Sequence, residues 1–147
     1  MENEMNRTSN FLVATLFLLT LSFVLGVFEL PRACAHSYPN AITAVSAKAK
    51  ADAGKAVLID VREDSEIADG MAAPAEWYAK SKIDENEIAF TKHLGGFSGK
   101  EIILYCRSGK RASVVIEKLA TQGIKAWNMG GYSDWVAAGF QTKRQKK

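Results

Sequence analysis

The sequence predicts an α/β fold in which a central parallel sheet is flanked by helices. Two short runs, residues 56–61 and 101–105, are almost continuously apolar, which is the composition of strands buried on both faces of a sheet. Segments with helical character lie between and after these runs, and glycines mark where several of them end. Strands that alternate with helices are typical of a parallel sheet, because each crossover needs a long connection.

The helices before the second strand are predicted from composition and capping signals. The Ala- and Lys-rich stretch 41–53 favours a helix that Gly54 ends, and the charged residues 62–69 predict a loop or a short helix. Two further helices are expected. The first begins at Pro74 and includes Trp77 and Tyr78. The second is capped by Asp84, with Glu87 three residues later, and runs to His93 before it ends at Gly95-Gly96.

The second apolar strand leads to a cysteine and then to the rest of the domain. Residues 101–105 are followed at once by Cys106 and a polar turn. The remaining expected elements are a helix over 112–122 that Gly123 ends, a strand over 124–127, a turn at Gly130-Gly131 and a helix over 132–138 that Gly139 closes.

An apolar segment near the N-terminus predicts a signal sequence or a membrane anchor. Residues 11–28 contain no charged side chain. Ala33-Cys34-Ala35 has the small-x-small pattern of a cleavage site that would leave His36 as the new N-terminus. Both alternatives stay open, with cleavage preferred. The chain is therefore divided into a signal peptide or anchor (1–35), a folded domain (36–142) and a basic tail (143–147).

Both alternatives predict the same side of the membrane for the folded domain. If the amino end stays in the cytoplasm, the domain is extracytoplasmic, which means periplasmic in a Gram-negative bacterium. It would be secreted after cleavage, or anchored by residues 11–28 if they are kept. Membrane contact is expected only through that segment.

Composition and charge exclude several functions for the 147-residue chain. The net charge of +3 owes much to the C-terminal tail, and no basic stripe with interleaved aromatic residues occurs elsewhere. There is no zinc-ligand spacing and no Gly-rich nucleotide loop. Nucleic acid is therefore not an expected partner.

Of the two cysteines, Cys106 has the setting of a reactive thiol. It lies at the carboxyl end of a predicted strand, where ligands bind in open α/β sheets. A tight loop that enters a helix points several backbone N–H groups inward, which favours an anion and the thiolate form of cysteine. Arg107, Lys110 and Arg111 add positive charge around it. Cys34 follows the apolar segment, so a disulfide between the two is not expected.

Three motifs, in order, resemble the rhodanese superfamily. They are the loop from Cys106 to Arg111, the strand Leu58-Ile59-Asp60-Val61-Arg62, and Gly130-Gly131-Tyr132-Ser133-Asp134-Trp135 with Gly139 after it. The resemblance covers about residues 40–141 and implies a three-layer fold. One segment departs from it: the family's Gly-His-Ile-Pro-Gly-Ala is Gly70-Met71-Ala72-Ala73-Pro74-Ala75 here, so the wall of the substrate pocket differs.

The resemblance implies a sulfurtransferase with Cys106 as the catalytic nucleophile. Cys106 would take a sulfane sulfur from an anionic, thiosulfate-like donor and pass it, as a persulfide, to cyanide or a thiol, which a partner protein could carry. The implied substrate-binding residues are Arg107, Ser108, Gly109, Lys110 and Arg111. Asp60 and Arg62 would support the loop structurally. The implied chemistry needs neither a metal nor an organic cofactor.

Four alternatives remain beside this interpretation. The domain could be a persulfide carrier, or a binding module without catalysis, and Arg111 could cap its helix instead of contacting substrate. A phosphatase or arsenate reductase is disfavoured, because phosphatase loops of the tyrosine type have five residues between cysteine and arginine, whereas four lie between Cys106 and Arg111.

Overall fold

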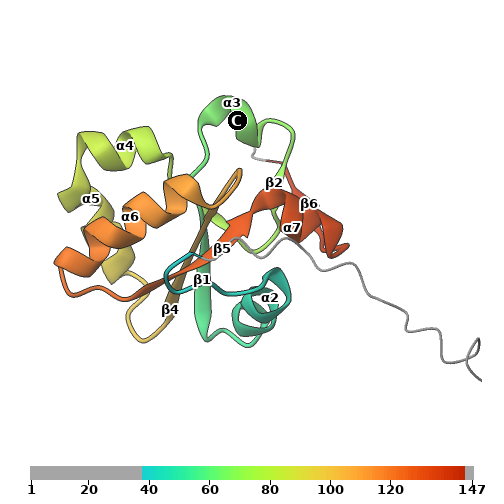
Figure 1. Ribbon diagram of the computed structural model, residues 1–147, viewed down its shortest axis with the longest axis horizontal. Helices are drawn as coiled ribbons and strands as arrows, with labels where there is room; N and C mark the ends of the chain where they lie inside the picture. The colour runs from blue at the N-terminus through green and yellow to red at the C-terminus, as the bar shows by residue number, and fades with distance from the viewer. Residues whose placement is uncertain (1–37, 145–147) are drawn as a thin grey trace, which may run out of the picture. The chain divides into compact units, whose positions relative to one another are not determined.

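A computed structural model of the protein describes residues 38–144 (Figure 1). Its elements are, in chain order, α2 (Ala44–Asp52), β1 (Ala56–Asp60), α3 (Asp64–Ile67), β2 (Met71–Ala72), β3 (Glu76–Trp77), α4 (Lys80–Glu85), α5 (Glu87–Gly95), β4 (Glu101–Cys106), α6 (Lys110–Thr121), β5 (Ala126–Gly131), α7 (Tyr132–Ala137) and β6 (Thr142–Lys143).

The core of the domain is a four-stranded parallel sheet in the order β3-β1-β4-β5. Every residue of β1 is buried, as expected for a central strand covered on both faces. β1 and β4 pair in register from Ala56 with Glu101 to Asp60 with Tyr105. Because the strands are parallel, their carboxyl ends meet at one edge, where Asp60 lies beside the residue that precedes Cys106.

Helices cover both faces of this sheet, so the domain has three layers (Figure 1). One face packs against α4, α5 and α6, and Cys106 points to this side together with Ile102 and Leu104. The other face packs against α2, α7 and the antiparallel pair of β2 with β6, through residues such as Ile103 and Tyr105. The α/β prediction with a flanked parallel sheet is therefore confirmed.

The helix expected from Pro74 through Tyr78 is wrong. Glu76 and Trp77 instead form β3, which pairs with the end of β1. The Tyr78 N–H donates to the Asp60 carbonyl, and the Trp77 indole N–H donates to the Arg62 carbonyl at 2.8 Å. The open edge of β1 thus decides the conformation of a segment too short to show a strand pattern of its own.

The expected helix cap at Asp84 is also wrong. Asp84 lies inside α4, where its carboxylate accepts from Lys80 at 2.5 Å. The cap of α5 is Asn86, whose side-chain oxygen accepts from the Ala89 N–H at 2.9 Å. Asn and Asp are comparable caps, so the sequence signal alone did not separate them.

At the C-terminal end, two predicted boundaries move. Gly130-Gly131, expected as a turn, completes β5, and α7 begins directly after it. Lys143, assigned to a basic tail, belongs to β6, which pairs with β2 in the second sheet. Lys143 pairs there with Met71 and Gly131 pairs with Cys106, whereas the N–H groups of Gly130 and Gly131 donate to nearby side-chain oxygens.

The predicted signal peptide or anchor, residues 1–35 with the apolar segment 11–28 and Cys34, lies outside the described residues and stays a prediction. Within residues 38–144, every helix is too short or too polar to cross a membrane.

A buried ion pair closes the carboxyl end of β1. The side chains of Asp60 and Arg62 are 0% and 6% exposed, with Arg62 Nη2 2.7 Å from Asp60 Oδ2. The Arg62 Nε and backbone N–H also donate to the same carboxylate. The guanidinium then donates to the carbonyls of Glu66 and Gly70, so the pair fastens α3 and the turn after it to β1.

We predict that Arg62→Met destabilises the domain by about 3–5 kcal/mol, because it leaves the Asp60 carboxylate buried without a counter-charge. Urea unfolding at neutral pH measures this change in the free energy of unfolding. Asp84→Asn is the matched control: it removes a partly exposed carboxylate that pairs with Lys80 and Lys118, and it should cost less than about 1 kcal/mol. Equal losses in the two variants would contradict the role given to the buried pair.

Candidate active site

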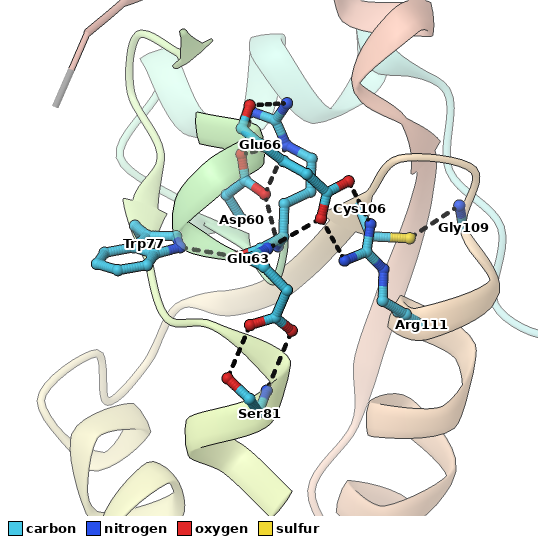
Figure 2. A network of polar contacts seen from close by, with 9 residues as sticks. Asp60, Glu63, Glu66, Trp77, Ser81, Cys106, Gly109 and Arg111 are labelled. Atoms are coloured by element: carbon cyan, nitrogen blue, oxygen red, sulfur yellow. Dashed lines mark hydrogen bonds and ion pairs between the residues drawn. The ribbon is translucent and has the colours of Figure 1, made fainter. Parts of the chain in front are cut away.

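The sulfur of Cys106 lies at the carboxyl end of β4 and is held by a backbone donor. Cys106 is 1% exposed and is a free thiol. The Gly109 N–H donates to its Sγ, with N and S 3.1 Å apart (Figure 2). A donor in this position stabilises negative charge on sulfur more than it stabilises the neutral thiol.

The turn after Cys106 is tighter than expected. Only Arg107, Ser108 and Gly109 separate β4 from α6, which begins at Lys110 and not at Ala112. Gly109 caps the helix in the left-handed conformation, with φ of +86°, which glycine adopts at little cost. By helix geometry, the first N–H groups of α6 have no carbonyl partner within the helix, and they lie at the end of the helix that follows the turn.

Asn128 supports this turn from β5, although sequence reasoning did not single it out. Its side-chain amide donates to the Gly109 carbonyl at 3.0 Å and to Ser113 Oγ at 2.8 Å. Its side-chain oxygen accepts from the Gly130 N–H. Asn128 is 1% exposed. An asparagine inside an otherwise apolar strand pattern was the available signal, because a buried amide needs partners.

Gly131 explains part of the Gly-Gly motif. A Cβ atom at this position would lie 2.7 Å from the Arg107 carbonyl oxygen. Such a contact is too short for carbon and oxygen, so any larger residue would push the first residue of the turn away. Gly131 therefore lets β5 approach the backbone next to Cys106.

Arg111 is bound by a carboxylate that the sequence did not reveal. Its guanidinium binds Glu66 of α3 in a bidentate way, with nitrogen–oxygen distances of 2.5 and 2.7 Å (Figure 2). The Arg111 guanidinium also lies beside the Cys106 sulfur in this view. It is thus neither a simple helix cap nor a free anion ligand: it links α3 to the site.

The charges in this cluster stabilise one another. Hydrogen bonding from Arg111 lowers the pKa of Glu66 from 4.5 to about 2. The hydrogen bonds to Glu66, and then the nearby Cys106 sulfur, raise the pKa of Arg111 above its ordinary value. Both side chains stay charged over the whole physiological range.

The other residues predicted for the site fall into two groups. Arg107, Ser108 and Lys110 are exposed, and no ion pair joins either cation to another residue of the described part. Asp60 and Arg62 are buried and support the site indirectly, because they hold α3 and hence the backbone of Glu66. The structure brings all eight predicted residues to one edge of the sheet.

Several other residues take structural places. His93 packs between the rings of Tyr78 and Phe97 on α5, and Trp135 is fully buried in the core. Met71, in the segment that departs from the family pattern, is 2% exposed and fills the core. Within residues 38–144, no cluster of three or more His, Cys, Asp or Glu side chains could hold a metal ion.

Comparison with known proteins decides the family. The model of the rhodanese-like domain matches residues 43–138. The chain belongs to the rhodanese-like family. The Bacillus subtilis protein named "Putative sulfurtransferase YtwF" is 36% identical over 96 residues, which are 64% of this chain and 87% of that one.

Solved rhodanese-like structures have the same fold. A rhodanese-related protein of Thermoplasma volcanium superposes with a TM-score of 0.61 at 22% identity, covering 73% of this chain and all of that one. A rhodanese-like domain protein of Staphylococcus aureus gives a TM-score of 0.58 at 28% identity, covering 74% of this chain and all of that one. The three-layer rhodanese-like fold expected from the motifs is confirmed.

We predict that the Glu66–Arg111 pair stabilises the domain by about 1–2 kcal/mol at neutral pH. This is less than the lowered pKa of Glu66 alone would give, because both side chains are partly exposed and water screens their charges. Since the pKa of Glu66 is lowered on folding, the stabilisation is complete above pH 4.5 and is lost as the pH falls toward 2. A double-mutant cycle of Glu66→Gln and Arg111→Gln, followed by urea unfolding at several pH values, isolates this coupling.

The exposed Lys48–Asp52 pair serves as the control for that cycle, with an expected coupling below about 0.5 kcal/mol. A Glu66–Arg111 coupling that is no larger than this, or that grows as the solution is acidified, would contradict the assignment.

Proposed function

We propose that this rhodanese-like domain is a sulfurtransferase that carries a sulfane sulfur on Cys106, from an anionic donor to a thiophilic acceptor. The observation that carries the proposal is the sulfur of Cys106 held by the Gly109 N–H where β4 turns into α6. The family membership and the name of the Bacillus subtilis relative support the same class of reaction.

The reaction has two displacements at sulfur. The Cys106 thiolate attacks the outer sulfur of a donor such as thiosulfate, the S–S bond of the donor breaks, and sulfite leaves with the electron pair. An acceptor, cyanide or a thiolate, then attacks the terminal sulfur of the persulfide. Thiocyanate or a new persulfide forms, and the electron pair of the broken S–S bond returns to the Cys106 thiolate.

The turn can stabilise the charged species of both steps. The Gly109 N–H and the first N–H groups of α6 are fixed donors for a negative persulfide, as an oxyanion hole is for oxygen. Arg107 and Lys110 are exposed in and directly after the turn that follows Cys106 and would attract an anionic donor. The near-complete burial of Cys106 favours a small donor and keeps bulk water from the persulfide.

The same geometry disfavours phosphate as substrate. A phosphatase would use Arg111 to bind a phosphate dianion, but in this domain Glu66 occupies two of its N–H donors. A dianion would therefore meet a carboxylate at the same place. A persulfide carrier uses the same first displacement and differs only in its acceptor, a thiol on a partner protein.

We predict that incubation of the full-length protein with thiosulfate adds one sulfur, about 32 mass units, to its intact mass, and that cyanide removes it. Cys106→Ser should show no gain, whereas the matched variant Cys34→Ser should gain sulfur as the wild type does. No gain with thiosulfate or with a persulfide donor would support the non-catalytic binding module, and turnover of an aryl phosphate would support the phosphatase.

We also propose that the domain works outside the cytoplasm, secreted or anchored by residues 11–28, and in the periplasm if the source is Gram-negative. The apolar, uncharged character of that segment supports this. Fractionation of the source cells should find the protein in the extracytoplasmic or membrane fraction, and N-terminal sequencing should separate cleavage after Ala35 from an intact anchor. The variant with Leu18→Arg and Leu19→Arg should stay in the cytosol. Wild-type protein found only there would refute the proposal.

A further inference from the structure

The first described residues of the chain reach the candidate active site from the side of β5. Ile42 donates its N–H to the Asn128 carbonyl, and Asn128 donates its N–H to the Asn40 carbonyl, both at 2.9 Å. These bonds form a parallel bridge at Ala41. The bridge places Tyr38, which precedes it by three residues, on the turn that follows Cys106.

Tyr38 contacts this turn in two ways. Its phenolic O–H donates to the carbonyl of Ser108. Its ring lies over Gly109, so closely that a Cβ atom added there would be 2.8 Å from the Tyr38 Cζ. Gly109 therefore has two reasons to be glycine: its positive φ and the ring above it.

The hydroxyl of Tyr38 and the sulfur of Cys106 are connected through one peptide unit. The Ser108 carbonyl accepts from Tyr38, and the N–H of the same planar unit, on Gly109, donates to Cys106 Sγ. A hydrogen bond to the carbonyl of an amide fixes the plane of that amide and polarises it, which strengthens its N–H as a donor. The contact of Tyr38 is therefore transmitted to the sulfur.

We propose that Tyr38 is a positioning residue that favours the thiolate of Cys106 through the Ser108–Gly109 peptide. Its part in sulfur transfer rests on the proposed function, but its effect on the thiol does not. Of the charged groups near the sulfur, Arg111 of α6 interacts with it and binds Glu66 of α3, and the exposed cations Arg107 and Lys110 lie in and directly after the same turn. Tyr38→Phe alters none of these four residues.

The test compares Tyr38→Phe with Tyr78→Phe in the full-length protein. Tyr38→Phe keeps the ring over Gly109 and removes only the hydroxyl. Tyr78→Phe removes a hydroxyl on the α4–α5 side, where its ring packs against Phe90 and His93. The rate of alkylation of Cys106 by iodoacetamide is followed against pH, and peptide mass spectrometry assigns the label to Cys106 and not to Cys34.

We expect Tyr38→Phe to move the pH midpoint of Cys106 alkylation upward by about half to one unit, which lowers the rate below the midpoint about 3- to 10-fold. The rate of sulfur uptake from thiosulfate should fall by a similar factor, with little change in the KM for the donor. Tyr78→Phe should match the wild type. With 4-aminophenylalanine at position 38, which keeps a donor on the ring, much of the shift should be reversed.

The outcomes separate this inference from the proposed function. An unshifted midpoint in folded Tyr38→Phe, checked by circular dichroism, overturns the role of Tyr38, even if the protein takes up sulfur. A shifted midpoint in a protein that takes up no sulfur supports Tyr38 and counts against the sulfurtransferase. If Tyr38→Phe does not fold, the same comparison is made between two variants that carry 4-aminophenylalanine or 4-methylphenylalanine at position 38. Equal pH midpoints of Cys106 alkylation in these two variants overturn the role of Tyr38.

Discussion

The buried pair of Asp60 with Arg62 is the interaction on which the site depends. A carboxylate and a guanidinium are brought out of water at the end of the central strand, and their cost is offset by several mutual hydrogen bonds. The remaining donors of Arg62 hold the carbonyls of Glu66 and Gly70. Because α3 is fixed in this way, Glu66 meets Arg111, and Arg111 lies beside Cys106 (Figure 2).

Backbone geometry, more than side-chain chemistry, shapes the surroundings of the sulfur. Gly109 supplies the N–H donor, Asn128 holds its carbonyl, Gly131 makes room for the turn, and Tyr38 binds the neighbouring carbonyl. These contacts come from the turn itself, from β5 and from the segment before α2. A donor held from several elements needs little reorganisation when charge develops on sulfur, which is the condition for electrostatic stabilisation of an anion.

The positive charges at the start of α6 reduce the stability of that helix. Lys110 and Arg111 occupy the first turn of α6, which contains no acidic residue, although the helix dipole disfavours cations there by about 0.3–1 kcal/mol each. Glu66 compensates for Arg111 from another element. Cations in the first turn of a helix are expected where function, and not helix stability, selects the residue. Their presence here agrees with an anion that binds at Cys106.

The sequence by itself determined the architecture and the place of Cys106 in it. Apolar runs identify buried parallel strands without any knowledge of their partners, and parallel strands must align their carboxyl ends, so Cys106 and Asp60 were predicted at one edge. Local pattern could not assign β3 or β6, which are two residues long and exist because another strand offers its edge. Nor could it pair Glu66 with Arg111, 45 residues apart, or Tyr38 with Ser108, 70 apart. Periodicity reports which side of an element is buried, whereas partners across such distances are chosen only when the chain packs.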